Sequence, residues 1–181
     1  MRLLQSRHAL DVWLREARAA EPERPLHFVP TMGALHAGHQ ALIERATQPR
    51  GGPPPRVLVS VFVNPLQFGP GEDLERYPRT MEADAELAAA AGADALFAPA
   101  SEDLYPEGEE GLTRVVPPPA LTRSLCGRHR PGHFEGVATV VCRLLALVRP
   151  DRLLLGEKDW QQLVILRRVI RDLALPLTVE G

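Results

Sequence analysis

Residues 56–63, RVLVSVFV, form a valine-rich run in which polar and apolar side chains do not alternate. A strand with one face toward water alternates them, whereas a strand of a parallel sheet is covered on both faces and reads as a nearly continuous apolar run. We therefore predict a buried strand here, in a parallel sheet that has helices on both sides.

Short apolar runs predict further strands at residues 26–30, 94–98, 113–116, 152–155 and 175–180. Apolar residues at helical spacing predict helices at residues 5–20, 40–47, 81–91, 134–148 and 159–173. Strands that alternate with helices predict an α/β fold, a Rossmann-like doubly wound parallel sheet with helices on both faces. Ligands bind at the carboxyl ends of such strands, so the loops after residues 30, 63 and 155 should line one crevice.

Composition excludes several classes of protein. The 181 residues carry a formal net charge of -2, without the basic excess of a nucleic-acid binder. Charges recur through the first twenty residues, so we expect neither a signal peptide nor a membrane span. Two cysteines, Cys126 and Cys142, are too few for a disulfide framework. We expect a cytoplasmic protein with no nucleic-acid or membrane partner.

Lys158 is the only lysine among 21 basic residues, and the other twenty are arginines. The bias toward arginine has a simple explanation in the coding preference of a genome. A second explanation is chemical, because a compact ammonium suits a point contact to phosphate better than a planar guanidinium does. Both explanations stay open on composition alone.

The loop at residues 30–39, PTMGALHAGH, lies between a predicted strand and a predicted helix. His36 and His39 are three residues apart and project to one side at a helix start, where free N–H groups attract phosphate oxygens. Gly38 lets a ligand approach the backbone. No Walker-type Gly-Lys-Ser/Thr is present. The histidines are alternatively structural, or they bind zinc with the remote partners Cys126, His129 and His133.

Three further loops carry polar residues. Asn64 and Gln67 follow the buried strand, and ordinary turn chemistry is their alternative role. A locally basic stretch at residues 127–137 either attracts polyphosphate or is an exposed loop. In residues 156–162, GEKDWQQ, the lone lysine precedes Asp159, a natural helix N-cap that could instead reach a ribose hydroxyl, and Gln162 follows on the first helical turn.

Taken together, PTMGALHAGH, VNPLQF, DLERYPR, RPGHFEGV and GEKDWQQL resemble the pantothenate synthetase (pantoate–β-alanine ligase) family of the HxGH nucleotidylyltransferase superfamily. The resemblance covers essentially the whole chain. It implies condensation of (R)-pantoate with β-alanine at the expense of ATP, through a pantoyl adenylate, to give pantothenate, AMP and pyrophosphate. It also implies a homodimer, with Mg²⁺ accompanying ATP.

The resemblance assigns roles by motif position. The catalytic residues would be His36, His39 and Lys158. The ATP-binding residues would be Met32, Gly33, Ala34, Leu35, His36, Ala37, Gly38, His39, Gly156, Glu157, Lys158 and Asp159. Pantoate and β-alanine would be bound by Asn64, Gln67 and Gln162, with Tyr77, Arg130 and His133 in support. Asp84 is the candidate metal ligand.

Members of the family continue into a smaller C-terminal domain that covers the phosphates, whereas this sequence stops at Gly181. We therefore expect residues 1–181 to be the nucleotide- and pantoate-binding domain, without its lid, and turnover by this chain is in doubt. The rival interpretations are another HxGH adenylyl- or cytidylyltransferase, a fragment of a class I tRNA synthetase, a catalytically dead nucleotide-binding module, and a zinc-binding interaction domain.

Overall fold

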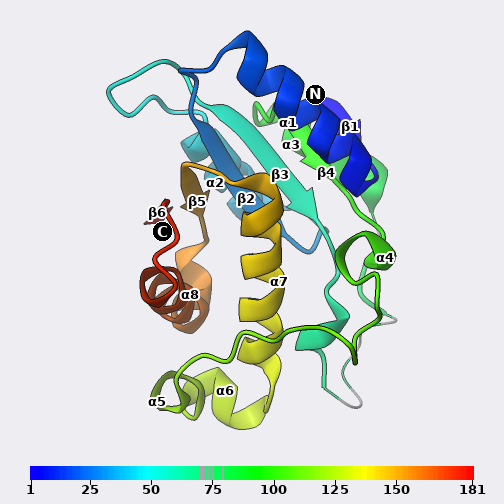
Figure 1. Ribbon diagram of the computed structural model, residues 1–181, viewed down its shortest axis with the longest axis vertical. Coiled ribbons are helices and arrows are strands. Elements are labelled where there is room, and N and C mark those ends of the chain that lie inside the picture. Colours follow the sequence, from blue (N-terminus) through cyan, green and yellow to red (C-terminus); the bar gives the residue numbers. More distant parts are fainter. Residues whose placement is uncertain (70–71, 73, 75, 79) are drawn as a thin grey trace.

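A parallel β-sheet forms the centre of the chain in the computed structural model, which describes residues 1–69, 72, 74, 76–78 and 80–181 (Figure 1). Within these residues the sheet has six strands in the order β1-β4-β3-β2-β5-β6, and every pair is parallel. The strands are β1 (Arg2–Leu4), β2 (Leu26–Thr31), β3 (Arg56–Val61), β4 (Ala95–Phe97), β5 (Arg152–Leu154) and β6 (Thr178–Glu180). The predicted fold class is confirmed.

The strand β3 is buried along its whole length, as its valine-rich sequence predicts. It lies between β2 and β4, so both edges are hydrogen-bonded. Its valines Val57, Val59 and Val61 belong to one hydrophobic cluster, whereas Leu58 and the following Phe62 belong to another. The two clusters lie on opposite faces because successive side chains of a strand alternate.

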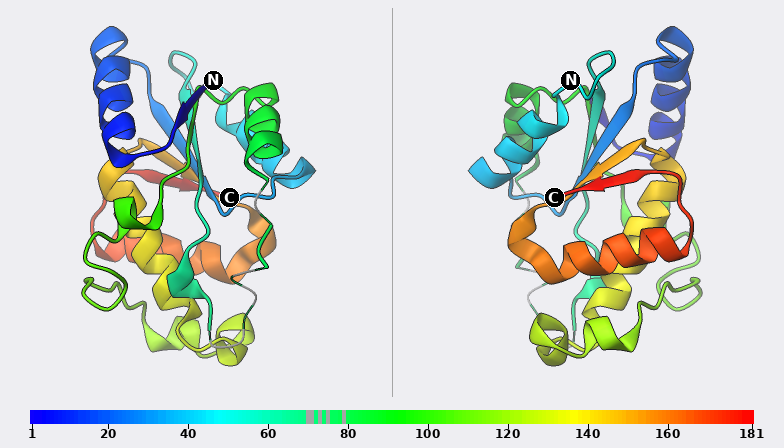
Figure 2. Two further views of the ribbon diagram at one scale, coloured as in Figure 1. Left: turned by 90° about the vertical axis from the view of Figure 1, so that its right-hand side faces the viewer. Right: turned by 90° about the vertical axis from the view of Figure 1, so that its left-hand side faces the viewer.

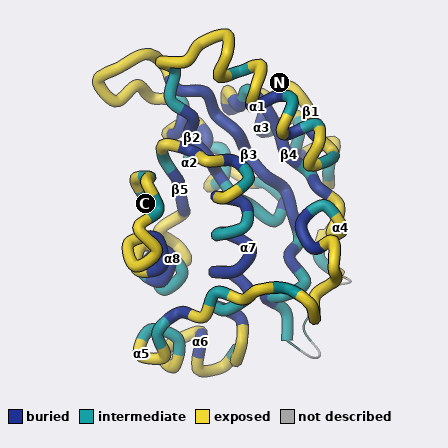
Figure 3. Tube along the Cα trace, viewed as in Figure 1, coloured by how far each residue is buried: buried dark blue, intermediate teal, exposed yellow. Residues whose placement is uncertain are grey.

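Helices cover both faces of the sheet (Figure 2). The helices α2 (Ala37–Ala46) and α3 (Met81–Ala90) supply side chains to the cluster that contains the β3 valines. The helices α1 (Arg7–Ala20), α7 (His133–Val148) and α8 (Trp160–Asp172) supply them to the other cluster. The four inner strands β2 to β5 and most of α7 are largely buried, whereas the connection after α2 is largely exposed (Figure 3). The sheet is therefore doubly wound, as predicted.

The order of the strands brings three loops together. From β2 the chain moves outward in one direction through β3 to β4, and later it returns to the other side of β2 to form β5 and then β6. The carboxyl ends of β3, β2 and β5 are therefore adjacent. The switch point between β2 and β5 is where ligands bind in sheets of this kind.

Several local predictions were wrong. Residues 113–116 are extended but do not form a strand, because the Val115 N–H donates to Thr139 Oγ1 of α7, 3.0 Å away. The edge strand β1 was missed. So were the short elements η1 (Pro65–Gln67), α4 (Ser101–Leu104), α5 (Pro119–Thr122), α6 (Leu125–His129) and η2 (Glu157–Asp159). The helix α2 begins three residues earlier than predicted, because His36 caps it and accepts a hydrogen bond from the Gly38 N–H.

No helix in the described part of the chain has the length and apolarity that a membrane span needs.

Glu180 joins the edge strand β6 to its surroundings through three arginines. Its carboxylate accepts from Arg45 Nε at 2.6 Å, from Arg50 at 3.0 Å and from Arg152 at 3.3 Å, and its side chain is 15% exposed. Burial raises the pKa of Glu180, but the hydrogen bonds from Arg45 and Arg50 outweigh burial and hold the pKa below its usual value.

We predict that Glu180→Gln lowers the free energy of unfolding at neutral pH by about 1–2 kcal/mol, since charge-assisted hydrogen bonds are lost. Because the folded pKa is lowered, this stabilisation is present above the ordinary pKa of about 4.3 and is lost as the pH falls further. Urea unfolding of both proteins between pH 7 and pH 3 measures the difference. Glu23→Gln, the same change at an exposed position, is the control. A difference in unfolding free energy between Glu180→Gln and the unmodified protein that persists at pH 3 would contradict the ion-pair explanation.

Candidate active site

The loop between β2 and α2 makes a close approach to α3. Gly33 and Ala34 have positive φ angles of 89° and 50°. A Cβ atom on Gly33 would lie 2.9 Å from Asp84 Oδ2 and 2.9 Å from Val61 Cγ1, so only glycine fits this turn without displacement of its neighbours. The turn directs the next two backbone N–H groups toward α3.

The Asp84 carboxylate accepts those N–H groups. Its oxygens lie 3.0 Å from the Ala34 nitrogen and 2.7 Å from the Leu35 nitrogen, and Thr80 Oγ1 donates from 3.2 Å. Asp84 is 2% exposed. A buried carboxylate of this kind needs such donors, and it holds the loop in place in return. These bonds indicate a positioning role for Asp84, and metal coordination by Asp84 stays a prediction.

His36 and His39 face each other, with ring centroids 4.2 Å apart. Nδ1 of His36 accepts the Gly38 N–H at 3.0 Å, and Nδ1 of His39 accepts the His36 N–H at 3.4 Å. A neutral imidazole that accepts at Nδ1 carries its proton on Nε2. Both rings therefore offer an Nε2–H donor at the start of α2, where anions bind.

Electrostatics connects this histidine pair to the loop after β5. Burial lowers the pKa of His39, repulsion from a protonated His36 and from Lys158 lowers it further, and Asp84 and Asp159 oppose the shift. Because its pKa is lowered, His39 stays neutral to a lower pH than an ordinary histidine does. The influence of Lys158 and Asp159 on His39 indicates that the loops after β2 and β5 lie close together, as predicted.

The loop after β5 is open to solvent. Gly156, Glu157, Lys158 and Asp159 are exposed, and a Cβ atom on Gly156 would meet no atom within 4 Å. Lys158 makes no ion pair with any residue that the structure describes. Asp159 occupies the N-cap position of α8, as predicted, but its side chain makes no capping hydrogen bond. These groups are therefore available to a ligand.

The loop after β3 contributes two buried amides. Asn64 and Gln67 are 1% and 7% exposed. Asn64 Nδ2 donates to Gln67 Oε1 at 3.1 Å and to the Gly136 carbonyl oxygen at 3.2 Å. Gln67 Nε2 lies 2.9 Å from Met32 Sδ, so its amide contacts the β2–α2 loop. The structure therefore brings together residues from two of the predicted loops.

Arg130 and His133 surround the backbone of Gln67. The His133 Nδ1 atom lies 2.8 Å from the Gln67 carbonyl oxygen, and Arg130 donates to the same oxygen at 3.3 Å. Arg130 also makes two hydrogen bonds of 2.8 and 2.6 Å to Glu72, which lower the pKa of Glu72 to about 2. Both residues therefore hold the loop after β3 in place, and their implied support of pantoate and β-alanine binding stays a prediction.

Gln162 and Tyr77 are less firmly held. Gln162 is half-buried on the first turn of α8, and its side chain makes no hydrogen bond to the described residues. Tyr77 is half-buried and packs edge-on against Phe68, with ring centroids 6.2 Å apart. The segment around Tyr77 includes positions 70, 71, 73, 75 and 79, which lie outside the described residues, so the motif DLERYPR is only partly placed.

The zinc alternative lacks a set of ligands. Among the residues that the structure describes, no three His, Cys, Asp or Glu side chains cluster as a metal site requires. The predicted remote partners do not join the histidine pair to complete one: Cys126 and His129 are exposed in α6, and His133 is bonded to the Gln67 backbone.

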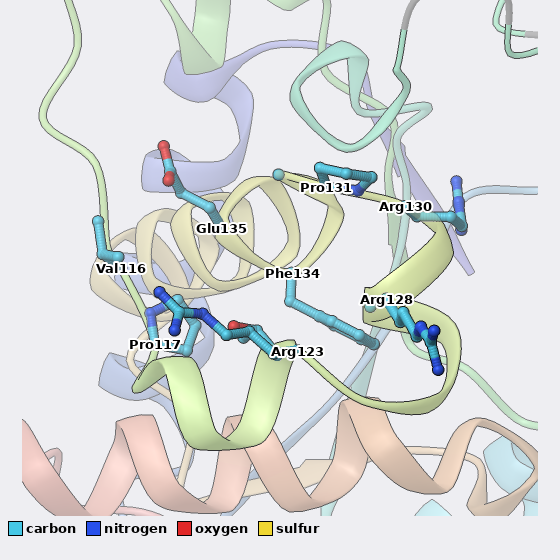
Figure 4. Close-up of a pocket in the computed structure, with 11 residues that line it drawn as sticks. Val116, Pro117, Arg123, Arg128, Arg130, Pro131, Phe134 and Glu135 are labelled. Carbon is cyan, nitrogen blue, oxygen red and sulfur yellow. The ribbon is translucent and has the colours of Figure 1, made fainter.

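A cavity of about 350 Å³ lies outside this cluster of loops (Figure 4). It is bounded by the segment at residues 116–117, by α5 and α6, and by the first turn of α7. Its lining contains Arg123, Arg128 and Phe134 but neither predicted histidine nor Lys158. Arg130 is the one residue that it shares with the surroundings of Gln67.

Sequence reasoning missed two features of the site. Tyr105, at the end of α4, donates its hydroxyl to Asn64 Oδ1 at 2.8 Å, and no sequence motif connects these positions. The bonds of Asp84 to the β2–α2 loop depend on how α3 packs, whereas the sequence suggested only an acidic metal ligand. The only signal for Tyr105 is the scarcity of tyrosine, since the chain has two.

The fold and the loops define a class: α/β proteins with a ligand site at the switch point of a doubly wound sheet. The family model for pantoate-beta-alanine ligase matches residues 2–181. The chain belongs to the pantoate–β-alanine ligase family.

Individual relatives agree. The chain is 60% identical over 176 residues to a bifunctional pantoate ligase/cytidylate kinase from Synechococcus sp. (strain RCC307), and this covers 97% of the chain and 33% of the relative. A crystal structure of pantothenate synthetase from Thermus thermophilus matches with a TM-score of 0.86 and 54% identity, over 100% of this chain and 61% of that one. A pantoate-beta-alanine ligase from Francisella tularensis, complexed with Beta-gamma ATP and Beta-alanine, matches with a TM-score of 0.86 and 36% identity, over 99% and 66%. The chain thus spans about a third of the first relative and about two thirds of the last.

We predict that Asp84→Asn loosens the β2–α2 loop, because an amide nitrogen would face a backbone N–H. The expected loss is about 1–3 kcal/mol of stability and about tenfold in ATP affinity. Chemical unfolding and ATP titration, both in EDTA, measure these effects without any metal. Glu82→Gln, an exposed acid-to-amide change in the same turn of α3, is the control. Losses that appear only with Mg²⁺ would favour the metal-ligand role instead.

Proposed function

We propose that this chain binds ATP and (R)-pantoate in an enzyme that condenses pantoate with β-alanine. The proposal is carried by one observation: at the carboxyl ends of the adjacent strands β3, β2 and β5, two buried amides, a histidine pair and a lone lysine converge. Membership of the pantoate–β-alanine ligase family supports it, and so does the Francisella tularensis relative, whose structure is complexed with Beta-gamma ATP and Beta-alanine.

In the first step, a carboxylate oxygen of pantoate attacks the α-phosphorus of ATP, and the bond to the β-phosphate oxygen breaks to release pyrophosphate. Residues 32–39 and 156–159 bind ATP. The Nε2–H groups of His36 and His39 donate to phosphate oxygens, and the Lys158 ammonium stabilises the charge that develops on the α-phosphate. Neutral amides of Gln67 and Gln162 orient pantoate without neutralising its nucleophilic carboxylate. Asn64, which was predicted to share this role, has its amide fully hydrogen-bonded within the protein and instead holds Gln67.

In the second step, the amine of β-alanine attacks the acyl carbon of pantoyl adenylate. The bond to the phosphate oxygen breaks, AMP leaves, and the amine loses a proton to give pantothenate. The described residues do not provide a carboxylate set for Mg²⁺, because Asp84 already accepts two N–H groups and a hydroxyl. We therefore assign no step to Mg²⁺, although we expect it to accompany ATP on phosphate and water oxygens.

The assembly and location of the protein are further proposals. We expect a homodimer and a cytoplasmic location, as the family resemblance implies. Val116 is consistent with an interface, since it is 68% exposed on the extended segment at residues 113–118, which has no strand partner among the described residues. Light scattering of the purified chain measures the mass of the assembly directly.

We predict that Lys158→Ala lowers pantoate-dependent release of pyrophosphate about 100-fold or more, because the α-phosphate loses its point charge. The fold should stay intact, since the side chain is exposed and unpaired among the described residues. Pyrophosphate release and thermal unfolding measure the two effects. Arg171→Ala, an exposed basic change on α8, is the control. Near-full turnover by Lys158→Ala would overturn the assignment.

Should the chain alone not turn over, ligand binding still tests the substrate. We predict that Gln67→Ala weakens pantoate binding about tenfold or more while ATP affinity changes less than about twofold, because a hydrogen bond to a charged ligand is lost. Isothermal calorimetry measures both ligands, with the exposed change Gln48→Ala as control. An equal loss for both would indicate a folding defect, and a wild-type chain that binds ATP but no pantoate would favour another nucleotidylyltransferase.

A further inference from the structure

Tyr105 is a buried tyrosine outside the predicted site, and its hydroxyl has one hydrogen-bond partner among the residues that the structure describes. The residue is 4% exposed and follows the short helix α4. Its ring packs edge-on against Phe62, with centroids 6.0 Å apart, and the Arg143 guanidinium lies 5.9 Å from the ring centroid. The ring therefore packs in the hydrophobic cluster that contains Phe62, while the hydroxyl donates to Asn64 Oδ1 at 2.8 Å.

The Asn64 amide can take only one orientation. The Leu66 backbone N–H donates to Oδ1 at 3.3 Å, and the Gly136 carbonyl oxygen accepts from Nδ2 at 3.2 Å. Backbone groups have fixed roles as donors and acceptors, so they decide which end of the amide is oxygen. Tyr105 adds the second donor to Oδ1, and Nδ2 is left to donate to Gln67.

The orientation of Asn64 in turn decides that of Gln67. Because Asn64 Nδ2 donates to Gln67 Oε1 at 3.1 Å, the opposite end of the Gln67 amide must be the Nε2 donor. That donor lies 2.9 Å from Met32 Sδ, and a thioether is a weak acceptor. A carboxylate or hydroxyl oxygen would be a far better partner, so the amide is arranged to donate to a ligand.

We propose that Tyr105 is a positioning residue for substrate recognition: its hydrogen bond holds the Asn64 side chain, and with it the Gln67 amide, in the position from which Gln67 donates to pantoate. This inference rests on the proposed function. Burial raises the pKa of Tyr105, so its hydroxyl remains a donor throughout the working range of pH. In this role the phenol acts without contacting the ligand. Its O–H group donates to Asn64, so that every polar atom between Tyr105 and the Gln67 oxygen has its hydrogen-bond partners.

Tyr105→Phe removes the donor and keeps the ring. Because Asn64 Oδ1 loses one hydrogen bond and the Gln67 amide is held less firmly, we expect the Kd for pantoate to rise about tenfold. The Kd for ATP should change less than about twofold. In the Gln67→Ala background the same change should have no effect on pantoate, because the amide that it positions is gone. Calorimetry on the four proteins, with low-affinity titrations at millimolar pantoate, measures this double-mutant cycle.

The matched control is Thr139→Val, which removes another buried hydroxyl and its bond to the Val115 N–H without touching Asn64 or Gln67. It should lower the melting temperature to a similar degree and leave both affinities unchanged. An unchanged pantoate affinity in Tyr105→Phe, an equal loss for ATP, or additive losses in the double variant would overturn the inference. The proposed function has its own test in the same experiment: if the wild-type chain does not bind pantoate, the proposed function is wrong, whatever the role of Tyr105.

Discussion

The parallel pairing of β2 with β3 on one side and β5 on the other is the constraint on which the site depends. His39, Gln67 and Lys158 are far apart in the sequence and share no helix or hairpin. They lie at the same edge of the sheet because each follows one of three adjacent parallel strands. Since the strands are covered by apolar helices on both faces, the energy that fixes the site comes mainly from hydrophobic burial far from the ligand.

The polar groups at this edge divide into two kinds by their partners. Asp84 and Asn64 are buried, and their oxygens and nitrogens are bonded to backbone groups whose roles cannot change. Lys158 and Gln162 have no such partners among the described residues and face solvent at least in part. Groups of the first kind resist movement, because a lost bond would leave a buried polar atom unpaired. Groups of the second kind are free to bind a ligand at little cost to the fold.

The sequence predicted the parts of the fold that depend on patterns within one element. The strand β3 was identified from its valines, and α8 from its helical spacing. The edge strand β1 was missed, and the segment at residues 113–116 was wrongly predicted as a strand, because three or four extended residues become a strand only if a neighbour offers hydrogen bonds. Motifs likewise indicated candidate site residues, but a contact such as that of Tyr105 with Asn64, across 41 positions, depends on tertiary packing that no local pattern encodes.

Gly136 shows how that packing reaches the site. It lies on α7, and a Cβ atom there would come within 2.1 Å of the Leu66 carbonyl oxygen, so α7 and η1 are in backbone contact. The same residue offers its own carbonyl oxygen to Asn64. Because α7 is buried along most of its length, its position is set by the hydrophobic core. The position of the Gln67 amide therefore depends on core packing that reaches it through Gly136 and Asn64, and in the proposed function α7 thereby contributes to pantoate recognition.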